Sequence, residues 1–481
     1  MNEYKLFTQR IGLIGISNLM VGLSGIILIP ILTKTLSIED YGIWAQIMVT
    51  IGLIPSIVML GLPYAMVRFL AGAKKKEDIS EGFYSIAFIV LITSAVSSIL
   101  LFLASDSIAA ILFDGNIDVA KTLSALVFVE CLNSLMINYF RTFQRIRKYS
   151  TFTLIRTYLD LIVVAYFVLS GYGILGATMG LLITKSFTLF IMATLVIAEI
   201  GFRMPKFTNI RDYLAFGLPT VPANLSSWVV TSSDRYVIGI LLSTAFVGYY
   251  SPGYALGNTI QMFVAPLGVM LPAVLSKYYD ENKLEETKAI LKYSLKYFLL
   301  LAIPSAVGLS LLSRSILLII STPEIASEGY LITPFVAVSA VLFGGLVVIN
   351  HILVLEKKTA ITGSIYILAA ALNFGLNLIL IPYIGILGAA IATLVAYLSI
   401  FIIGIYYSFK YLTFDIDLYF ILKSLFASIV MSLIIIRWNP EGLSSVLITI
   451  CACAVVYSTV LLILKGISRE ELIFFKNLFQ G

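Results

Sequence analysis

The pentapeptide Gly-Ile-Leu-Gly-Ala occurs twice in this chain, at residues 173–177 and again at residues 385–389. Each copy follows a short turn and opens a long apolar run. The match extends upstream, where Gly42 aligns with Gly248 at an offset of 206 residues, against 212 for the two pentapeptides. An offset that drifts so little indicates an internal duplication with small insertions.

The composition places both copies of this unit in a membrane. Apolar residues make up 60% of the chain, charged residues only 12%, and the mean hydropathy is +1.01. Soluble domains are about 45–50% apolar. Runs of about 20 apolar residues, long enough to cross the hydrocarbon as helix, recur along the whole sequence. A transmembrane barrel would instead show ten-residue alternating segments. We therefore predict an all-α integral membrane protein.

We expect about 14 transmembrane helices. Their predicted positions are residues 11–33, 41–66, 82–103, 119–140, 151–170, 173–197, 213–233, 245–273, 291–313, 328–350, 360–382, 385–408, 419–438 and 443–464. Proline lacks the backbone N–H that a helix interior needs, so Pro219 and Pro222 predict a break in the seventh span.

The basic residues predict the topology. With a cytoplasmic N-terminus, 23 Lys and Arg residues fall in inner segments and 5 in outer segments. This asymmetry predicts a multi-pass protein of the cell (inner or plasma) membrane with both termini cytoplasmic. Orientation and contact with anionic lipid account for the net charge of +6, so we expect a bilayer and no nucleic acid as partner.

The duplication predicts the domain organisation. Each copy holds six spans, an even number, so both enter the membrane in the same orientation, as in many secondary transporters. We expect pseudo-symmetric six-helix lobes at residues 1–200 and 201–408 around a central cavity. Residues 409–481 would add a C-terminal helical hairpin and a short amphipathic cytoplasmic tail from Gly466 to Gly481.

The chain offers little material for conventional catalysis. Cys131, Cys451 and Cys453 lie inside predicted spans without metal-ligand spacing, and His351 is the one histidine. We therefore expect no catalytic residue, no metal site and no cofactor.

Three stretches carry a resemblance to a known family. They are Asn373-x3-Asn377-x4-Pro382-x2-Gly385-x2-Gly388-Ala389-Ala390, Leu32-Thr33-Lys34-x5-Asp40-Tyr41-Gly42-x-Trp44, and Asp234-Arg235-Tyr236-x-Ile238-Gly239. The chain resembles the Wzx-type oligosaccharide and polysaccharide flippases of the multidrug/oligosaccharidyl-lipid/polysaccharide (MOP) flippase superfamily.

That resemblance implies a flippase and not an enzyme. Its substrate would be an oligosaccharide linked to polyprenyl (di)phosphate, moved from the cytoplasmic to the outer leaflet by alternating access for surface polysaccharide biosynthesis, of which lipopolysaccharide O-antigen is one product. The implied partners are this substrate and the bilayer, with H⁺ or Na⁺ as a coupling ion and polysaccharide-assembly proteins as open alternatives.

Two other functions stay open at this point. One is a cation-coupled exporter of drugs or small solutes from the same superfamily. The other is a membrane oligosaccharide polymerase or glycosyltransferase, although loops of about fifteen residues leave little room for an extramembrane catalytic site. The internal duplication favours transport.

Five ionisable residues, Glu130, Arg156, Asp160, Lys185 and Asp234, lie deep in predicted spans, where each costs roughly 2.5–3.5 kcal/mol on insertion scales and so needs a wet cavity or a partner. Arg156 and Asp160 are four residues apart, which permits an internal ion pair. Alternatively, Arg156 and Lys185 face the substrate cavity and attract phosphate. In a third alternative, Glu130 and Asp160 bind the coupling ion.

Uncharged polar residues supply further candidates. We expect Asn18 on the first span, and Asn224, Ser227 and Thr231 on the seventh, to face the substrate cavity, because a lipid-facing helix has little use for them. Asp234 and Arg235 are candidates for a clasp at the outer gate.

Overall fold

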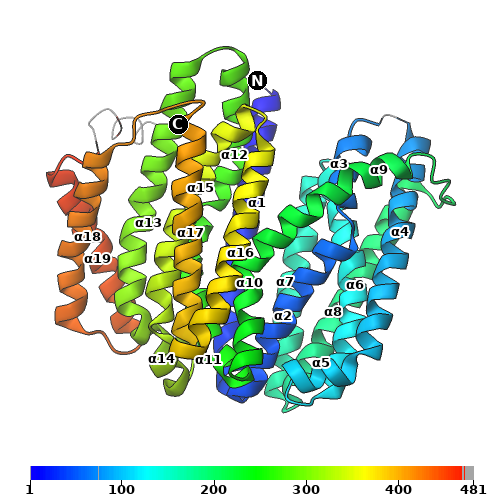
Figure 1. The fold of residues 1–481 in the computed structure, drawn as a ribbon, viewed down its shortest axis with the longest axis horizontal. Coiled ribbons are helices and arrows are strands. Elements are labelled where there is room, and N and C mark those ends of the chain that lie inside the picture. The colour runs from blue at the N-terminus through cyan, green and yellow to red at the C-terminus, as the bar shows by residue number, and fades with distance from the viewer. Residues whose placement is uncertain (1, 74, 468–470, 472–481) are drawn as a thin grey trace. The chain divides into compact units, whose positions relative to one another are not determined.

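The computed structural model describes residues 2–73, 75–467 and 471 (Figure 1). The first part of the chain forms α1 (Asn2–Thr35), α2 (Ile38–Val58), α3 (Leu62–Leu70), α4 (Lys76–Leu103), α5 (Ser105–Leu112), α6 (Ile117–Thr142), α7 (Ile146–Leu169), α8 (Gly173–Ile200), α9 (Ile210–Gly217), the 3-10 turn η1 (Leu218–Thr220) and α10 (Val221–Leu241). The rest forms α11 (Thr244–Asn258), the 3-10 turn η2 (Thr259–Phe263), α12 (Ala265–Asp280), α13 (Leu284–Ile320), α14 (Pro323–Gly329), α15 (Ile332–Leu355), α16 (Thr359–Ile384), α17 (Ile386–Phe409), α18 (Leu418–Trp438) and α19 (Leu443–Ile463).

The described residues contain helices and no strand, which confirms the all-α class. Twelve of these helices are long and apolar enough to cross a membrane. The other two expected spans, 213–233 and 245–273, are interrupted. Pro219 lies in η1 and Pro222 near the start of α10, so the predicted break is confirmed. The count of fourteen spans stays a prediction.

The chain forms two compact units. Unit 1 comprises residues 1–251 and 366–392, and unit 2 comprises residues 252–365 and 393–481. The expected lobes, 1–200 and 201–408, stay a prediction. The predicted tail helix, Gly466 to Gly481, lies outside the described residues except for its first two residues and Glu471.

In unit 1, α6 is the central helix, since it contacts α2, α3, α4, α5, α7 and α8. Its core side chains include Leu123, Leu126, Tyr139 and Phe140, each at most 2% exposed. Burial of such large apolar side chains is worth about 1.5–3 kcal/mol each. This packing fixes the face of α6 that meets α7 and α8, where the charged residues lie.

In unit 2, the 37-residue α13 packs against α15 and α18. The α18–α19 hairpin joins it through a buried polar contact. Ser424 and Tyr457 share a hydrogen bond of 2.8 Å, and the Tyr457 hydroxyl also donates to the carbonyl of Leu300 at 2.9 Å. A tyrosine buried between helices thus keeps its hydroxyl satisfied, as low-dielectric surroundings require.

Candidate functional site

Three helices of unit 1 meet around one buried carboxylate. Glu130, in the middle of α6, accepts from the Arg156 guanidinium of α7 at 2.9 Å and from the Lys185 ammonium of α8 at 2.7 Å. The two cations bind different oxygens of Glu130. Charge-assisted hydrogen bonds of this length are the strong ones.

Asp160 completes the group. Its carboxylate lies 3.8 Å from the Lys185 ammonium and accepts a hydrogen bond from the Thr184 hydroxyl. The network therefore contains two cations and two carboxylates and has no net formal charge. Such balance is what permits four ionisable groups to lie in membrane-spanning helices.

The members of this network differ in accessibility. The side chain of Lys185 is 3% exposed and that of Glu130 is 7% exposed, against 18% for Asp160 and 25% for Arg156. Arg156 is therefore the cation that a ligand can reach without rearrangement. Lys185 is buried and forms ion pairs with Glu130 and Asp160 in this conformation.

The sequence spacing suggested a pair between Arg156 and Asp160, and that interpretation is wrong. Arg156 forms its ion pair with Glu130, and Asp160 forms its ion pair with Lys185. The reason is tertiary, because α6 inserts Glu130 within reach of the α7 guanidinium.

Asn133, one turn after Glu130, also belongs to this crossing and was not anticipated. Its amide donates to the carbonyl of Lys185 at 2.8 Å and to that of Val129 at 3.2 Å, while Thr188 donates to its oxygen at 3.4 Å. Asn133 is fully buried. It therefore fixes the register of α6 against α8.

A second group of polar residues lines one face of α10. Asn224, Ser227 and Thr231 follow one another at spacings of three and four residues, which places them on the same side of a helix. Ser227 is exposed, and the other two are partly exposed. Tyr64, at the start of α3, donates to the Asn224 side-chain oxygen at 3.1 Å and is itself 45% exposed.

Tyr64 was not predicted, because nothing in its local sequence separates it from the other interfacial tyrosines. Asn18, expected in the same cavity, is exposed on α1. The structure therefore leaves both side chains accessible.

The predicted gate residues form a compact cluster at the far end of α10. Asp234, 1% exposed, accepts from the Arg235 guanidinium at 2.9 Å and from the Tyr250 hydroxyl. Arg235 also donates to the carbonyl of Thr231 at 2.7 Å and lies 5.5 Å above the Tyr250 ring. This cluster ties α10 to the start of α11.

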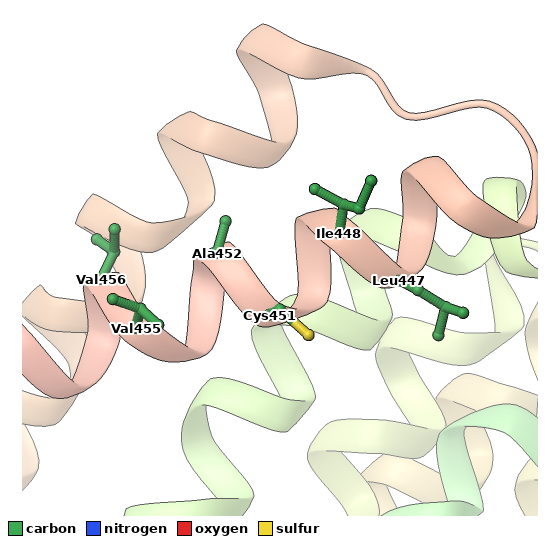
Figure 2. Close-up of a pocket in the computed structure, with 6 residues that line it drawn as sticks. All are labelled: Leu447, Ile448, Cys451, Ala452, Val455 and Val456. Atoms are coloured by element: carbon green, nitrogen blue, oxygen red, sulfur yellow. The ribbon is translucent and has the colours of Figure 1, made fainter.

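Two other features do not form a site of this kind. Figure 2 shows a hollow beside α19 whose lining side chains all come from that helix. They are Leu447, Ile448, Cys451, Ala452, Val455 and Val456, all without a polar group that could orient a ligand. In the part of the chain that the structure describes, no three His, Cys, Asp or Glu residues are grouped so as to hold a metal.

Comparison with known families identifies the chain. Residues 7–278 match the family described as polysaccharide biosynthesis protein, and residues 219–379 match the family described as MatE. The chain belongs to the polysaccharide biosynthesis protein family. The two family matches confirm the resemblance seen in the sequence.

Curated relatives of this polysaccharide biosynthesis protein occur in archaea. The chain is 22% identical over 282 residues to "Probable low-salt glycan biosynthesis flippase Agl15" of Haloferax volcanii, a match covering 58% of this chain and 59% of that one. It is 30% identical over 175 residues to "Probable flippase AglR" of the same organism, covering 35% of each. The chain thus matches less than two thirds of the length of either relative.

Solved structures confirm the fold of this family member. The lipid II flippase MurJ, in an inward closed conformation, superposes with a TM-score of 0.77 at 20% identity, over 98% of this chain and 99% of MurJ. An inward-facing multidrug resistance MATE transporter superposes with a TM-score of 0.71 at 16% identity, over 82% of this chain and 97% of that one. At these identities the likeness concerns the fold.

Proposed function

We propose that this protein moves a lipid-linked oligosaccharide, carried on a polyprenyl (di)phosphate, from the cytoplasmic to the outer leaflet of the cell membrane. Agl15 is named as a glycan biosynthesis flippase, and MurJ as a lipid II flippase. Each name joins a flippase to a glycan or to a lipid-linked substrate. The family match over residues 7–278 supports extending this activity to the present chain.

One observation carries the proposal, namely the polar face of α10. This helix has 21 residues, enough to cross the hydrocarbon, but it is not among the twelve helices apolar enough to do so facing lipid. Asn224, Ser227 and Thr231 are accessible on a single side of it. Accessible hydroxyl and amide groups at membrane depth require a water-filled path, and they are the groups that bind sugar hydroxyls.

The charged network supplies a place for phosphate. Arg156 presents a partly exposed guanidinium, whose planar set of donors matches phosphate oxygens. When a phosphate draws Arg156 away from Glu130, Lys185 still neutralises that carboxylate. The arrangement therefore releases one cation to the substrate while Glu130 keeps Lys185 as its partner, whereas a buried carboxylate without any cation would cost several kcal/mol.

The excess of basic residues in alternate segments supports cytoplasmic termini. This topology tells which end of each helix faces the cytoplasm, and so defines the direction of transport. Substrate made in the cytoplasm would enter from the basic side and leave at the opposite side. Energy for the cycle could come from a coupling ion, H⁺ or Na⁺.

A second candidate is cation-coupled export of small solutes. Residues 219–379 match MatE, and Asp160 is a carboxylate with 18% exposure beside a hydroxyl donor. Such a carboxylate could take up H⁺ or Na⁺ during a transport cycle. The match to the polysaccharide biosynthesis family covers more of the chain, so export ranks second.

The test is leaflet transfer in liposomes. Purified protein is reconstituted with a fluorescent, short-chain polyprenyl-diphosphate oligosaccharide, and transfer is scored by protection from an added quencher. We expect transfer above that of empty liposomes. Arg156→Ala should lower the transfer rate at least tenfold, which corresponds to a loss of about 1.4 kcal/mol of substrate stabilisation by the guanidinium.

Arg437→Ala is the matched control, since Arg437 is an exposed arginine in the last turn of α18. It should transfer at the native rate. No transfer by native protein under imposed H⁺ or Na⁺ gradients, together with gradient-driven efflux of organic cations, would replace the proposal by the exporter.

A further inference from the structure

The two copies of the internal repeat meet at a helix crossing in unit 1, between α2 and the first half of α11. A Cβ atom added to Gly42 would overlap the carbonyl oxygen of Thr244. A Cβ atom added to Gly248 would overlap the carbonyl oxygen of Ile38. Both contacts are therefore backbone against backbone, and glycine is the residue that permits such an approach.

These two contacts are copies of each other. Thr244 and Gly248 follow Ile38 and Gly42 by 206 residues, the offset that relates the two repeats here. Gly42 contacts Thr244, and Gly248 contacts Ile38, which is the equivalent of Thr244 in the first repeat. This reciprocity is the mark of a two-fold contact, so a pseudo-two-fold axis passes between Gly42 and Gly248.

Next to this crossing, α2 also runs beside α10, as Figure 1 shows. Trp228 of α10 donates to the carbonyl of Val49 at 3.2 Å, and Thr50 shares a hydrogen bond with the Tyr236 hydroxyl. We call these contacts of α2 with α10 and α11 the α2 seam.

Gln46 lies inside the α2 seam and is fully buried, with its side-chain amide against Gly239. Neither its Oε1 nor its Nε2 has a hydrogen-bond partner. Burying an amide without partners costs free energy that the same amide in water does not. The closed seam therefore contains a group that favours its opening.

Other buried amides of unit 1 have more partners than Gln46. Asn133, in the crossing of α6 with α8, is as buried as Gln46, but both its oxygen and its nitrogen are hydrogen-bonded. The nitrogen of Asn377 in α16 donates to Asn373, and its oxygen alone lacks a partner. Buried polar groups are as a rule hydrogen-bonded. Among the described residues, Gln46 is thus the buried amide that lacks a partner on both atoms, which singles out the α2 seam.

We propose that the α2 seam is the outer gate of the transporter, and that Gln46 sets the balance between its closed and open states. The proposal rests on the proposed function. Gly42 and Gly248 let the gate close with backbone against backbone. The side chain of Gln46 becomes hydrated when the gate opens, so it limits the stability of the closed state relative to the open state. The basic residues of the inner segments place the beginning of α2 at the outer side.

The experiment measures how often the seam opens, without any substrate. Cys131, Cys451 and Cys453 are replaced by alanine, and Thr50→Cys introduces a thiol into the seam at a position where the native threonine is 6% exposed. The labelling rate of this thiol by a water-soluble maleimide is followed with the full-length protein in nanodiscs. Labelling requires opening, so the rate reports the open population.

Gln46→Met keeps the volume and removes both unpartnered atoms, so it should slow labelling about tenfold or more. Gly248→Ala forces the backbones apart and should speed labelling. Gly375→Ala is the matched control, because a Cβ there meets nothing within 4 Å. It should leave the rate unchanged. If Gly248→Ala does not fold, Gln46→Met alone decides.

An unchanged labelling rate in Gln46→Met would overturn the gate. The same protein is assayed for leaflet transfer of the fluorescent glycan lipid, which separates the two proposals. Labelling that shifts as expected in a protein that transfers no glycan lipid supports the gate and rejects the function. If the protein transfers the glycan lipid but Gln46→Met leaves the labelling rate unchanged, the function is supported and the gate is rejected.

Discussion

Lys185 donates to Glu130 across 2.7 Å while only 3% of its side chain is exposed. Glu130 in turn holds the more accessible Arg156 at 2.9 Å. Lys185 is thus separated from any ligand by the carboxylate that it neutralises. The two basic residues therefore differ in accessibility, although both were candidates for phosphate contact in the sequence, and we expect their substitutions to have different effects.

Lys185→Met should clearly lower the stability of the protein, while the rate of leaflet transfer per folded molecule should change little. Removing the ammonium takes a cation from Glu130 and leaves Asp160 without an ion pair, and an uncompensated buried charge typically costs about 3–5 kcal/mol. Thermal unfolding of purified protein in nanodiscs measures the loss. In the double variant Glu130→Gln with Lys185→Met, much of this stability should return, because the pair is removed together. Equal stability of Lys185→Met and the native protein would show that the pair is dispensable.

Arg156→Lys should retain part of the transfer activity that Arg156→Ala loses. Lysine keeps the charge but cannot offer two parallel donors to a phosphate or to Glu130. We expect a rate between those of the native protein and Arg156→Ala in the liposome assay. Arg437→Lys, at the exposed end of α18, serves as its control. Full native activity in Arg156→Lys would mean that charge alone matters at this position.

The class of fold was predictable from the sequence because apolar runs of membrane length have few alternatives in lipid. The partners of the charged residues were not. Spacing along α7 suggested a bond between Arg156 and Asp160, whereas packing brings Glu130 of α6 to the arginine. Helical periodicity gives the face of a residue but not the neighbouring helix that covers it.

The same limit applies to the polar face of α10. Its residues Asn224, Ser227 and Thr231 could be found from their polarity within a predicted span. Tyr64 could not, since its contact with Asn224 joins residues 160 positions apart. Likewise, the aligned glycines at 42 and 248 showed a duplication, while their mutual contact required the folded chain.

Tyr64→Phe should reduce transfer with little loss of stability. The substitution removes one hydrogen bond at a partly exposed site, worth about 0.5–1.5 kcal/mol, and frees the Asn224 amide to rotate. We expect the half-saturating concentration of the fluorescent substrate to rise and the unfolding temperature to move by only a few degrees. Tyr166→Phe, at a site 64% exposed on α7, is the control and should behave as native. An unchanged substrate dependence would remove Tyr64 from the pathway.

Tyr250→Phe should loosen the joint between α10 and α11. The hydroxyl of Tyr250 donates to Asp234, which is 1% exposed and also holds Arg235. Loss of a hydrogen bond to a buried carboxylate costs roughly 1.5–3 kcal/mol. Hydrogen exchange should therefore speed up in residues 231–251 relative to α6. Unchanged exchange there would show that the Arg235 pair suffices.

Lys296 of α13 joins Glu471, which follows α19 in the chain, to unit 2. Its ammonium, 9% exposed, binds both oxygens of Glu471 at 2.9 and 3.0 Å and lies 3.8 Å from Asp417. Removing the cation leaves two carboxylates facing each other, whereas Glu471→Gln leaves Lys296 with Asp417 as a partner. We therefore expect Lys296→Met to destabilise the protein by about 3–5 kcal/mol and Glu471→Gln by clearly less.

Limited proteolysis and thermal unfolding in nanodiscs measure the two effects separately. In Lys296→Met, cleavage after α19 should become fast and the unfolding temperature should fall. In Glu471→Gln, the hydroxyl of Tyr297, which donates to Glu471 at 3.3 Å, can still hold the side-chain amide in place. A larger loss of stability in Glu471→Gln than in Lys296→Met would reverse this order and show that the acidic residue, not the lysine, organises the contact.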